Sequence, residues 1–141
     1  MTKILFDANV LLDFFLGRNP QPEKIEKLFS LIDNKTIEGY ITLSILQICA
    51  YYLSSVKGVE STKRILEMVI FKFQLLEDNR KIVLNALKSE HQDIEDAIQY
   101  FIALENEMDA IVTLDKEFLK LSSPNLPIYN PINLLEEFES F

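Results

Sequence analysis

The sequence is poor in the residues on which several common kinds of site depend. Its 141 residues include one cysteine, one histidine and three glycines. With Cys49 alone, the chain forms no internal disulfide and no cysteine-based zinc site. The glycines, Gly17, Gly39 and Gly58, are isolated from one another, so there is no glycine-rich phosphate loop. These absences argue against a cysteine-based zinc protein and against nucleotide-driven phosphoryl transfer.

Positive charge is also scarce. The chain has 14 basic and 22 acidic residues, which gives a net charge of -8 at pH 7. This balance argues against a general polyanion-binding protein held by long-range attraction, but it is compatible with a nuclease whose metal ions neutralise part of an acidic site. The single histidine, His91, stands next to acidic residues, and we interpret it as a solvated loop residue rather than a catalytic base.

Long apolar runs and a secretory signal pattern are absent as well. No apolar run reaches the ~18 residues that a membrane span needs, and the first residues lack the charged, apolar and small segments of a signal peptide. A lone thiol fits a reducing compartment. With 48% apolar residues over this length, the composition predicts one globular domain, which we expect to be cytoplasmic and without membrane contact.

Apolar strand patterns alternate with helical patterns along the chain. This alternation predicts an α/β fold, in which a parallel sheet carries helices on both faces. Strands are expected at residues 3–6, 40–43, 71–76, 110–113 and 128–129, and helices at 8–15, 23–33, 45–55, 61–70, 78–87, 93–106 and from 131. The helix over 45–55 is apolar almost all round, which predicts burial, and Ser44 is its expected cap.

Acidic residues follow two of these strands and open one helix. Asp7 comes directly after the first strand and Asp115 just after the strand over 110–113, so both lie at the carboxyl edge of the sheet. Asp93 and Asp96 are three positions apart, which places them on one face of the first turn of a helix, where negative charge is favourable. That Asp7 only caps the next helix remains an open alternative. Asp13 has no such spacing, and we interpret it as structural.

Acids that converge on one edge of a sheet repel one another unless a cation or a proton joins them. Hard divalent cations prefer oxygen ligands, and Mg²⁺ takes few carboxylates and keeps several waters. Such a site activates water and stabilises the charge of a phosphodiester during hydrolysis. No competing serine, cysteine or histidine arrangement is present in the sequence.

Three blocks of the sequence carry a resemblance to a known family. They read LFDANVLLD near the start, DIEDAIQYFIA in the third quarter and AIVTLDKEF shortly after it. In order and spacing they resemble the PIN-domain ribonucleases, many of which are VapC-type toxins of bacterial toxin–antitoxin pairs. The resemblance covers about residues 3–130, and the last two blocks are fairly specific together. It implies a single PIN-like domain over residues 1–141, built as a three-layer α/β/α sandwich around a parallel sheet of four to five strands.

The resemblance also implies a cofactor and a set of site residues. Asp7, Asp96 and Asp115 match the metal-binding and catalytic acids of the family, and Asp93 matches an accessory metal-binding acid found in one branch. Thr113 matches the hydroxyl residue before the last acid, which we expect to contact substrate. The implied activity is metal-dependent hydrolysis of RNA, single-stranded or structured, with Mg²⁺ or Mn²⁺.

The sequence departs from the family pattern on the helix after the second strand. The family usually has a glutamate there, whereas residues 44–50 read SILQICA and contain no acid. Gln47 offers a neutral oxygen, which is a poorer ligand, and Leu114 stands where a basic residue is common. Two functions therefore stay open: a ribonuclease in which Asp93 supplies the missing charge, or a catalytically impaired PIN-like module that binds RNA or protein.

Partners follow from the same resemblance. Toxins of this kind are usually homodimers that an antitoxin peptide inhibits, and the helices around residues 25–32 and 65–70 offer a surface for either, or else form core. Lys116 is a candidate contact to the RNA backbone, with a solvated surface lysine as the alternative. A receiver-type phosphate-handling domain would need a lysine just past its last strand, and here that strand ends in YNP.

Overall fold

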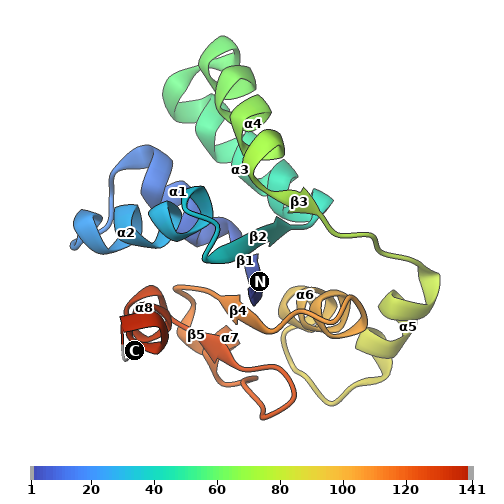
Figure 1. The fold of residues 1–141 in the computed structure, drawn as a ribbon. Coiled ribbons are helices and arrows are strands. Elements are labelled where there is room, and N and C mark those ends of the chain that lie inside the picture. Colours follow the sequence, from blue (N-terminus) through green and yellow to red (C-terminus); the bar gives the residue numbers. More distant parts are fainter. Residues whose placement is uncertain (1, 140–141) are drawn as a thin grey trace.

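The computed structural model describes residues 2–139, which form a five-stranded sheet between layers of helices (Figure 1). All neighbouring strands are parallel, and their order is β3-β2-β1-β4-β5. The predicted α/β class and its parallel sheet are therefore confirmed. The strands are β1 (Thr2–Phe6), β2 (Ile37–Ile41), β3 (Gln74–Leu75), β4 (Ala110–Val112) and β5 (Ile128–Tyr129).

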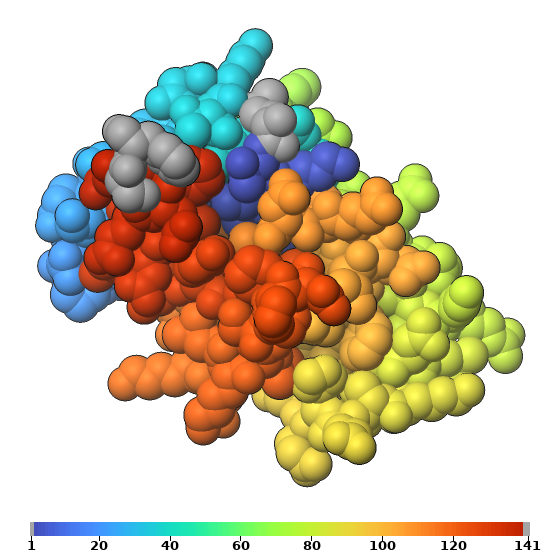
Figure 2. Space-filling view, turned by 60° about the horizontal axis from the view of Figure 1, so that its bottom comes forward, coloured from blue at the N-terminus to red at the C-terminus, as the bar shows by residue number. Residues whose placement is uncertain are grey.

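Helices cover both faces of this sheet, as the three-layer arrangement requires. The helices α1 to α4 lie at the left and top of Figure 1, on one side of the sheet, and α5 and α6 lie at the right, on the other side. The last helix, α8, packs beside α2, as the neighbouring red and light blue atoms in Figure 2 show. None of the helices within residues 2–139 combines the length and the apolar character that a membrane crossing requires. The helices are α1 (Ala8–Leu16), α2 (Pro22–Asp33), α3 (Leu43–Lys57), α4 (Val59–Lys72), α5 (Arg80–Lys88), α6 (Ile94–Glu105), α7 (Lys116–Leu119) and α8 (Pro131–Glu139).

The strand order reverses direction between β1 and β4. From β1 the chain first adds β2 and β3 on one side, and later β4 and β5 on the other. Open α/β sheets bind ligands at such a switch point, outside the carboxyl ends of the strands. Phe6 at the end of β1 pairs with Val112 at the end of β4, so the residues that follow both strands emerge side by side.

Two strands differ from the sequence prediction by more than one residue at an end. β2 covers Ile37–Ile41 rather than 40–43, because the chain leaves the sheet at Thr42. The buried Thr42 hydroxyl accepts a hydrogen bond from the N–H of Ile45 and caps α3, a role expected of Ser44. The third strand shortens to two residues, because the helical pattern of α4 continues to Lys72.

The predicted burial of the helix after β2 is wrong for one of its faces. On α3, Ile45, Cys49 and Leu53 are buried, but Tyr51 is 72% exposed and Val56 is 66% exposed. The helices α3 and α4 pack mainly on each other as a hairpin that extends away from the sheet (Figure 1). Only one side of α3 is therefore covered, and the apolar residues on its other side remain exposed.

An aromatic cluster fills the space between β1 and the helices above it. Phe6 makes edge contacts with Phe29 and Phe73, at centroid distances of 5.7 and 5.1 Å, and Phe14 stacks on Phe29 at 4.1 Å. Gly39 in β2 lies directly against this cluster. A β-carbon at Gly39 would meet the Phe73 ring at 2.7 Å, which is too close for any real contact.

Replacing Gly39 with alanine should therefore lower the free energy of unfolding by about 1–3 kcal/mol, the usual cost of overpacking. Urea unfolding followed by circular dichroism measures this loss. In a Phe73→Leu background the same substitution should cost clearly less, because leucine lacks the ring edge that the new methyl meets. An equal cost in both backgrounds would show that the Phe73 contact is not the cause.

Candidate active site

The residues that follow β1 and β4 line a pocket of about 380 Å³ together with the start of α6. Asp7 comes from the end of β1, Asp115 from the segment after β4, and Asp96 from the first turn of α6. Three acids that lie far apart in the sequence thus share one cavity, the acidic pocket. It lies at the switch point of the sheet, where the strand order predicts a ligand site.

Asp7 is fixed by hydrogen bonds from two directions. Its Oδ1 accepts from the N–H of Ala8 at 2.8 Å, so Asp7 does cap α1. Its Oδ2 accepts from the Thr113 hydroxyl at 2.7 Å. Burial raises the pKa of Asp7; the bonds from Thr113 and Ala8 lower it, and repulsion by Asp115 and Glu95 raises it again, so that the net shift is upward. The capping role is real and leaves the carboxylate in the pocket.

Thr113 links the ends of the two strands. Its hydroxyl donates to Asp7 and accepts from the N–H of Asp115 at 3.1 Å and from Asn9 Nδ2 at 3.3 Å. Asn9 completes the link, since its Oδ1 accepts from the N–H of Leu114 at 3.1 Å. Thr113 itself is fully buried, so in this structure it positions two acids and does not face the cavity.

The Asp96 carboxylate is the group that the hydrogen-bond network leaves incomplete. Its Oδ2 is buried and has no hydrogen-bond partner among the described residues. Burial raises the pKa of Asp96 to about 7, and repulsion by Asp93, then Asp115 and Asp7, contributes to the shift. Buried polar atoms are nearly always paired, so an orphaned carboxylate oxygen points to a missing proton or cation.

The remaining two predicted acids also cap helices. Asp115 accepts from the N–H of Glu117 at the start of α7 and lines the acidic pocket. Asp93 accepts from the N–H of Asp96 and caps α6. The exposed Asp93 does not line the acidic pocket but a neighbouring one that shares only Asp96 with it. Asp93 thus acts on the acidic pocket through the pKa of Asp96.

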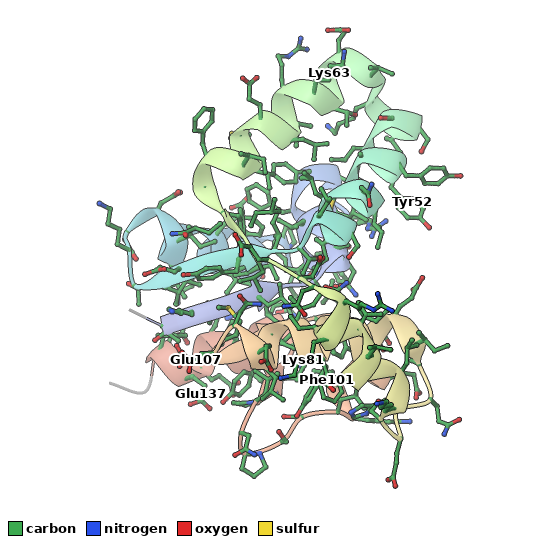
Figure 3. All side chains as sticks on the ribbon, turned by 90° about the vertical axis from the view of Figure 1, so that its right-hand side faces the viewer. Tyr52, Lys63, Lys81, Phe101, Glu107 and Glu137 are labelled. Atoms are coloured by element: carbon green, nitrogen blue, oxygen red, sulfur yellow. The ribbon has the colours of Figure 1, made fainter. Side chains whose placement is uncertain are left out.

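Three further residues of the pocket escaped sequence reasoning. Glu95 lines the pocket beside Asp96. Adjacent helix positions point in different directions, so the sequence gave no reason to expect both side chains in one site. Arg18 reaches it from the loop after α1, where Asp13 Oδ1 accepts from Arg18 Nε at 2.6 Å. Asp13 thus has the structural role that the sequence suggested. Tyr52 lines the pocket from α3, on the side toward which the strands point (Figure 3).

The wall that α3 contributes contains no acid. Ile48 and Tyr52 line the pocket there, whereas Gln47 is exposed and does not line it. The neutral oxygen of Gln47 therefore does not replace the helical glutamate in this structure. Lys116 is exposed on α7 and lines an adjoining pocket instead of the acidic one.

The donor set suits a hard divalent cation, although the carboxylates are not drawn together around one. Within residues 2–139, no three histidine, cysteine, aspartate or glutamate side chains form a ready-made metal-binding group. The charged ligands that the pocket offers are carboxylates, and one of their oxygens has no partner. A cation such as Mg²⁺ or Mn²⁺ would satisfy that oxygen and remove the mutual repulsion, so the residues present fit such an ion.

Comparison with known proteins identifies the family. A family model described as PIN domain matches residues 3–117, most of the chain. The chain therefore belongs to the PIN-domain family, as the three sequence blocks suggested. A search of curated proteins found no match.

Solved structures with the same fold include two of VapBC proteins. A chain of VapBC2 from Rickettsia felis, bound to a DNA fragment from their promoter, has a TM-score of 0.66 at 17% identity, over 92% of this chain and 98% of that one. VapBC-1 from nontypeable Haemophilus influenzae has a TM-score of 0.67 at 14% identity, over 93% and 99%. PAE2754 from Pyrobaculum aerophilum has a TM-score of 0.66 at 18% identity, over 99% and 98%. Identities this low establish a shared fold and nothing finer.

In the metal-free protein, the Asp96 carboxyl should titrate near pH 7 instead of near pH 4. Carbon-detected NMR of the side-chain carboxyl groups, assigned with Asp96→Asn, measures this value. The Asp93→Asn variant keeps a good helix cap and removes the largest repulsive charge, so it should lower the pKa of Asp96. Asp33→Asn, a surface control, should leave it unchanged; a value near 4 in the wild type would refute the expectation.

The same shift predicts a pH-dependent stability. Because the pKa of Asp96 is raised on folding, the folded protein binds more protons than the unfolded chain between about pH 4 and pH 7, and stability falls as pH rises through this window. Asp96→Asn cannot ionise, so in EDTA its advantage over the wild type should be larger at pH 8 than at pH 4.5. Urea midpoints at both pH values measure this difference, and an advantage that does not grow with pH would contradict it.

Proposed function

We propose that this PIN-domain protein is a metal-dependent ribonuclease and the toxin of a toxin–antitoxin pair. The observation that carries the proposal is the buried Oδ2 of Asp96, which has no hydrogen-bond partner among the described residues and belongs to a side chain that lines the acidic pocket with Asp7 and Asp115. A carboxylate in this state destabilises the protein unless a ligand completes it. Membership of the PIN family supports the assignment to a nuclease class.

The acids of the pocket and the residues that support them have distinct parts in the proposed reaction. Asp7, Asp96 and Asp115 hold Mg²⁺ or Mn²⁺, and Thr113 holds Asp7 in place. When bound, the ion supplies Lewis-acid activation of water and offsets the negative charge of the phosphodiester. Asp93 lies outside the acidic pocket; after burial, its charge is the largest cause of the raised pKa of Asp96, so it keeps the Asp96 carboxyl protonated to higher pH.

Asp96 also couples the site to pH. Near neutral pH its carboxyl carries a proton part of the time, and a cation has to displace that proton before the oxygen becomes a ligand. Metal binding therefore becomes tighter as pH rises through 7. Isothermal titration with Mn²⁺ at pH 6 and pH 8 measures this gain, which should disappear in Asp96→Asn.

The alternative is a PIN-like module that binds RNA or protein without cutting. It is favoured by the α3 wall, where Ile48 and Tyr52 stand in place of a carboxylate. In that case neither Mg²⁺ nor Mn²⁺ binds at millimolar concentration, and calorimetry distinguishes the two readings before any substrate is known.

The partner proposal draws on the fold relatives and on exposed apolar side chains. Two of the structural relatives come from VapBC complexes. In this chain Ile25, Leu28 and Phe29 are buried and belong to the core, whereas Phe71 on α4 is 83% exposed. We therefore assign the surface for an antitoxin peptide or a second copy of the chain to the α3–α4 hairpin, and not to the helix around residues 25–32.

The ribonuclease proposal is tested by cleavage of mixed-sequence RNA in Mn²⁺, with and without EDTA. Wild-type protein should cut only in the absence of EDTA. Asp7→Asn and Asp96→Asn should lower the rate at least ~100-fold, because each removes a proposed ligand to the ion. Thr113→Val should lower it less, since it loosens Asp7 without removing a carboxylate.

Asp33→Asn is the matched control for these variants, because Asp33 is exposed and pairs with Lys72 on the surface. It should cut at the wild-type rate. Circular dichroism and thermal melts establish that each variant is folded. Undiminished cleavage by folded Asp7→Asn or Asp96→Asn would remove the assignment.

A further inference from the structure

A second pocket, of about 300 Å³, adjoins the acidic pocket at two points of the chain. Asp115 lines the acidic pocket, and its neighbours Leu114 and Lys116 both line the second pocket. Arg18 lines the acidic pocket, and the next residue, Asn19, lines the second. Consecutive Cα atoms are about 3.8 Å apart. The two cavities therefore lie on opposite sides of the same short segments.

The charge of the second pocket is opposite to that of the first. Among residues 2–139, its charged lining residues are Lys24 of α2 and Lys116 of α7, and no acid lines it. Lys116 is exposed and Lys24 is half-buried, and both line the cavity. We call it the lysine pocket. In a chain of net charge -8, two lysines directly beside the acidic pocket form a local exception to the overall charge.

The rest of the lysine pocket is mostly apolar. Ile25 is 2% exposed and forms part of its floor, and Leu119 and Ile132 add further apolar surface. The segments that contribute these residues, α2, α7 and α8, meet on one side of the molecule in Figure 2, coloured light blue, orange and red. Apolar surface flanked by cations matches a nucleotide, whose base packs on apolar side chains while its phosphate meets the cations.

We propose that the lysine pocket binds the nucleotide adjacent to the phosphodiester that lies in the acidic pocket, which makes it a substrate subsite for a single RNA strand. The inference rests on the proposed ribonuclease function. The strand passes over Asp115 and beside Arg18, a basic side chain that lines the acidic pocket, and continues to Lys116 and Lys24. The acidic pocket repels a polyanion, and the neighbouring cations supply the attraction that it lacks.

The length of the substrate tests this subsite. Mixed-sequence oligoribonucleotides of two and of six nucleotides, both without terminal phosphates, are compared in Mn²⁺. The single phosphodiester of the dinucleotide lies in the acidic pocket when it is cut, so only the hexanucleotide brings a further phosphate to the two lysines. For the wild type, kcat/KM should be higher for the hexanucleotide. In Lys24→Gln/Lys116→Gln the ratio of hexanucleotide to dinucleotide kcat/KM should fall about tenfold. Lys63→Gln loses the same kind of charge at the far end of the α3–α4 hairpin (Figure 3) and should keep the wild-type ratio.

Binding supplies a second readout that a purely structural role would not change. In an Asp96→Asn background, fluorescence anisotropy with a labelled hexanucleotide gives Kd as a function of salt concentration. Each lysine that neutralises a phosphate contributes about 0.7 to the slope of log K against log salt for a single strand. The slope should fall by about 0.7 in Lys24→Gln and about 1.4 in the double variant, and stay unchanged in Lys63→Gln.

The outcomes separate this inference from the ribonuclease proposal. If the double variant cuts and binds the hexanucleotide as Lys63→Gln does, the subsite is overturned and the ribonuclease stands. If the wild type cuts neither oligonucleotide, the ribonuclease proposal fails, and the salt dependence of binding alone tests the subsite. A slope that falls in the lysine variants supports an RNA-binding subsite in a binding module. A slope that stays unchanged in them overturns the subsite. Circular dichroism shows that the lysine variants are folded.

Discussion

The pairing of β1 with β4 is the constraint on which the site depends. Phe6 and Val112 are partners in the ladder, and the N–H of Asp7 donates to the carbonyl of Val112 at 3.0 Å. The backbone of Asp7 is thus still bound to the sheet while its side chain already caps α1. On the other strand, Thr113 is fixed by its own N–H, which donates to the carbonyl of Tyr129 at 2.9 Å. The bond between the Thr113 hydroxyl and Asp7 follows from this register. If one strand slipped by one residue against the other, the two side chains would lie on opposite faces of the sheet.

Helix N-termini make the concentration of acids tolerable in the absence of a cation. Asp7, Asp93 and Asp115 each accept a backbone N–H at the start of a helix, where the partial positive charge stabilises a carboxylate. Asp96 lies in the first turn of α6 but accepts no such bond at Oδ2. The fold therefore stabilises three of these acids by itself and leaves the fourth dependent on a proton or an ion. The pKa of Asp96 is accordingly raised, by burial and by the charges of the three stabilised acids.

The sequence predicted the parts of the site that depend on the order of elements. Asp7 and Asp115 were placed correctly because each follows a strand, and the carboxyl ends of parallel strands share an edge. Asp93 shows the limit of helical spacing: as a cap it has extended backbone geometry, so its side chain turns back to the N–H of Asp96 and not into the pocket. Arg18 and the exposed face of α3 depend on how loops and hairpins pack, which no periodicity in the sequence records.

The missing acid on α3 bears on the choice between a nuclease and a binding module. Mg²⁺ is usually held by one or two carboxylates and keeps several waters, so a pocket with Asp7, Asp96 and Asp115 does not require a fourth ligand from α3. A module that never binds an ion would gain stability by losing the orphaned charge of Asp96, since a buried carboxylate without a partner costs free energy and does nothing in return. The structure nevertheless keeps Asp96 beside two further acids and surrounds them with supporting hydrogen bonds. That combination is easier to explain by a cation at the switch point than by a module that only binds RNA or protein.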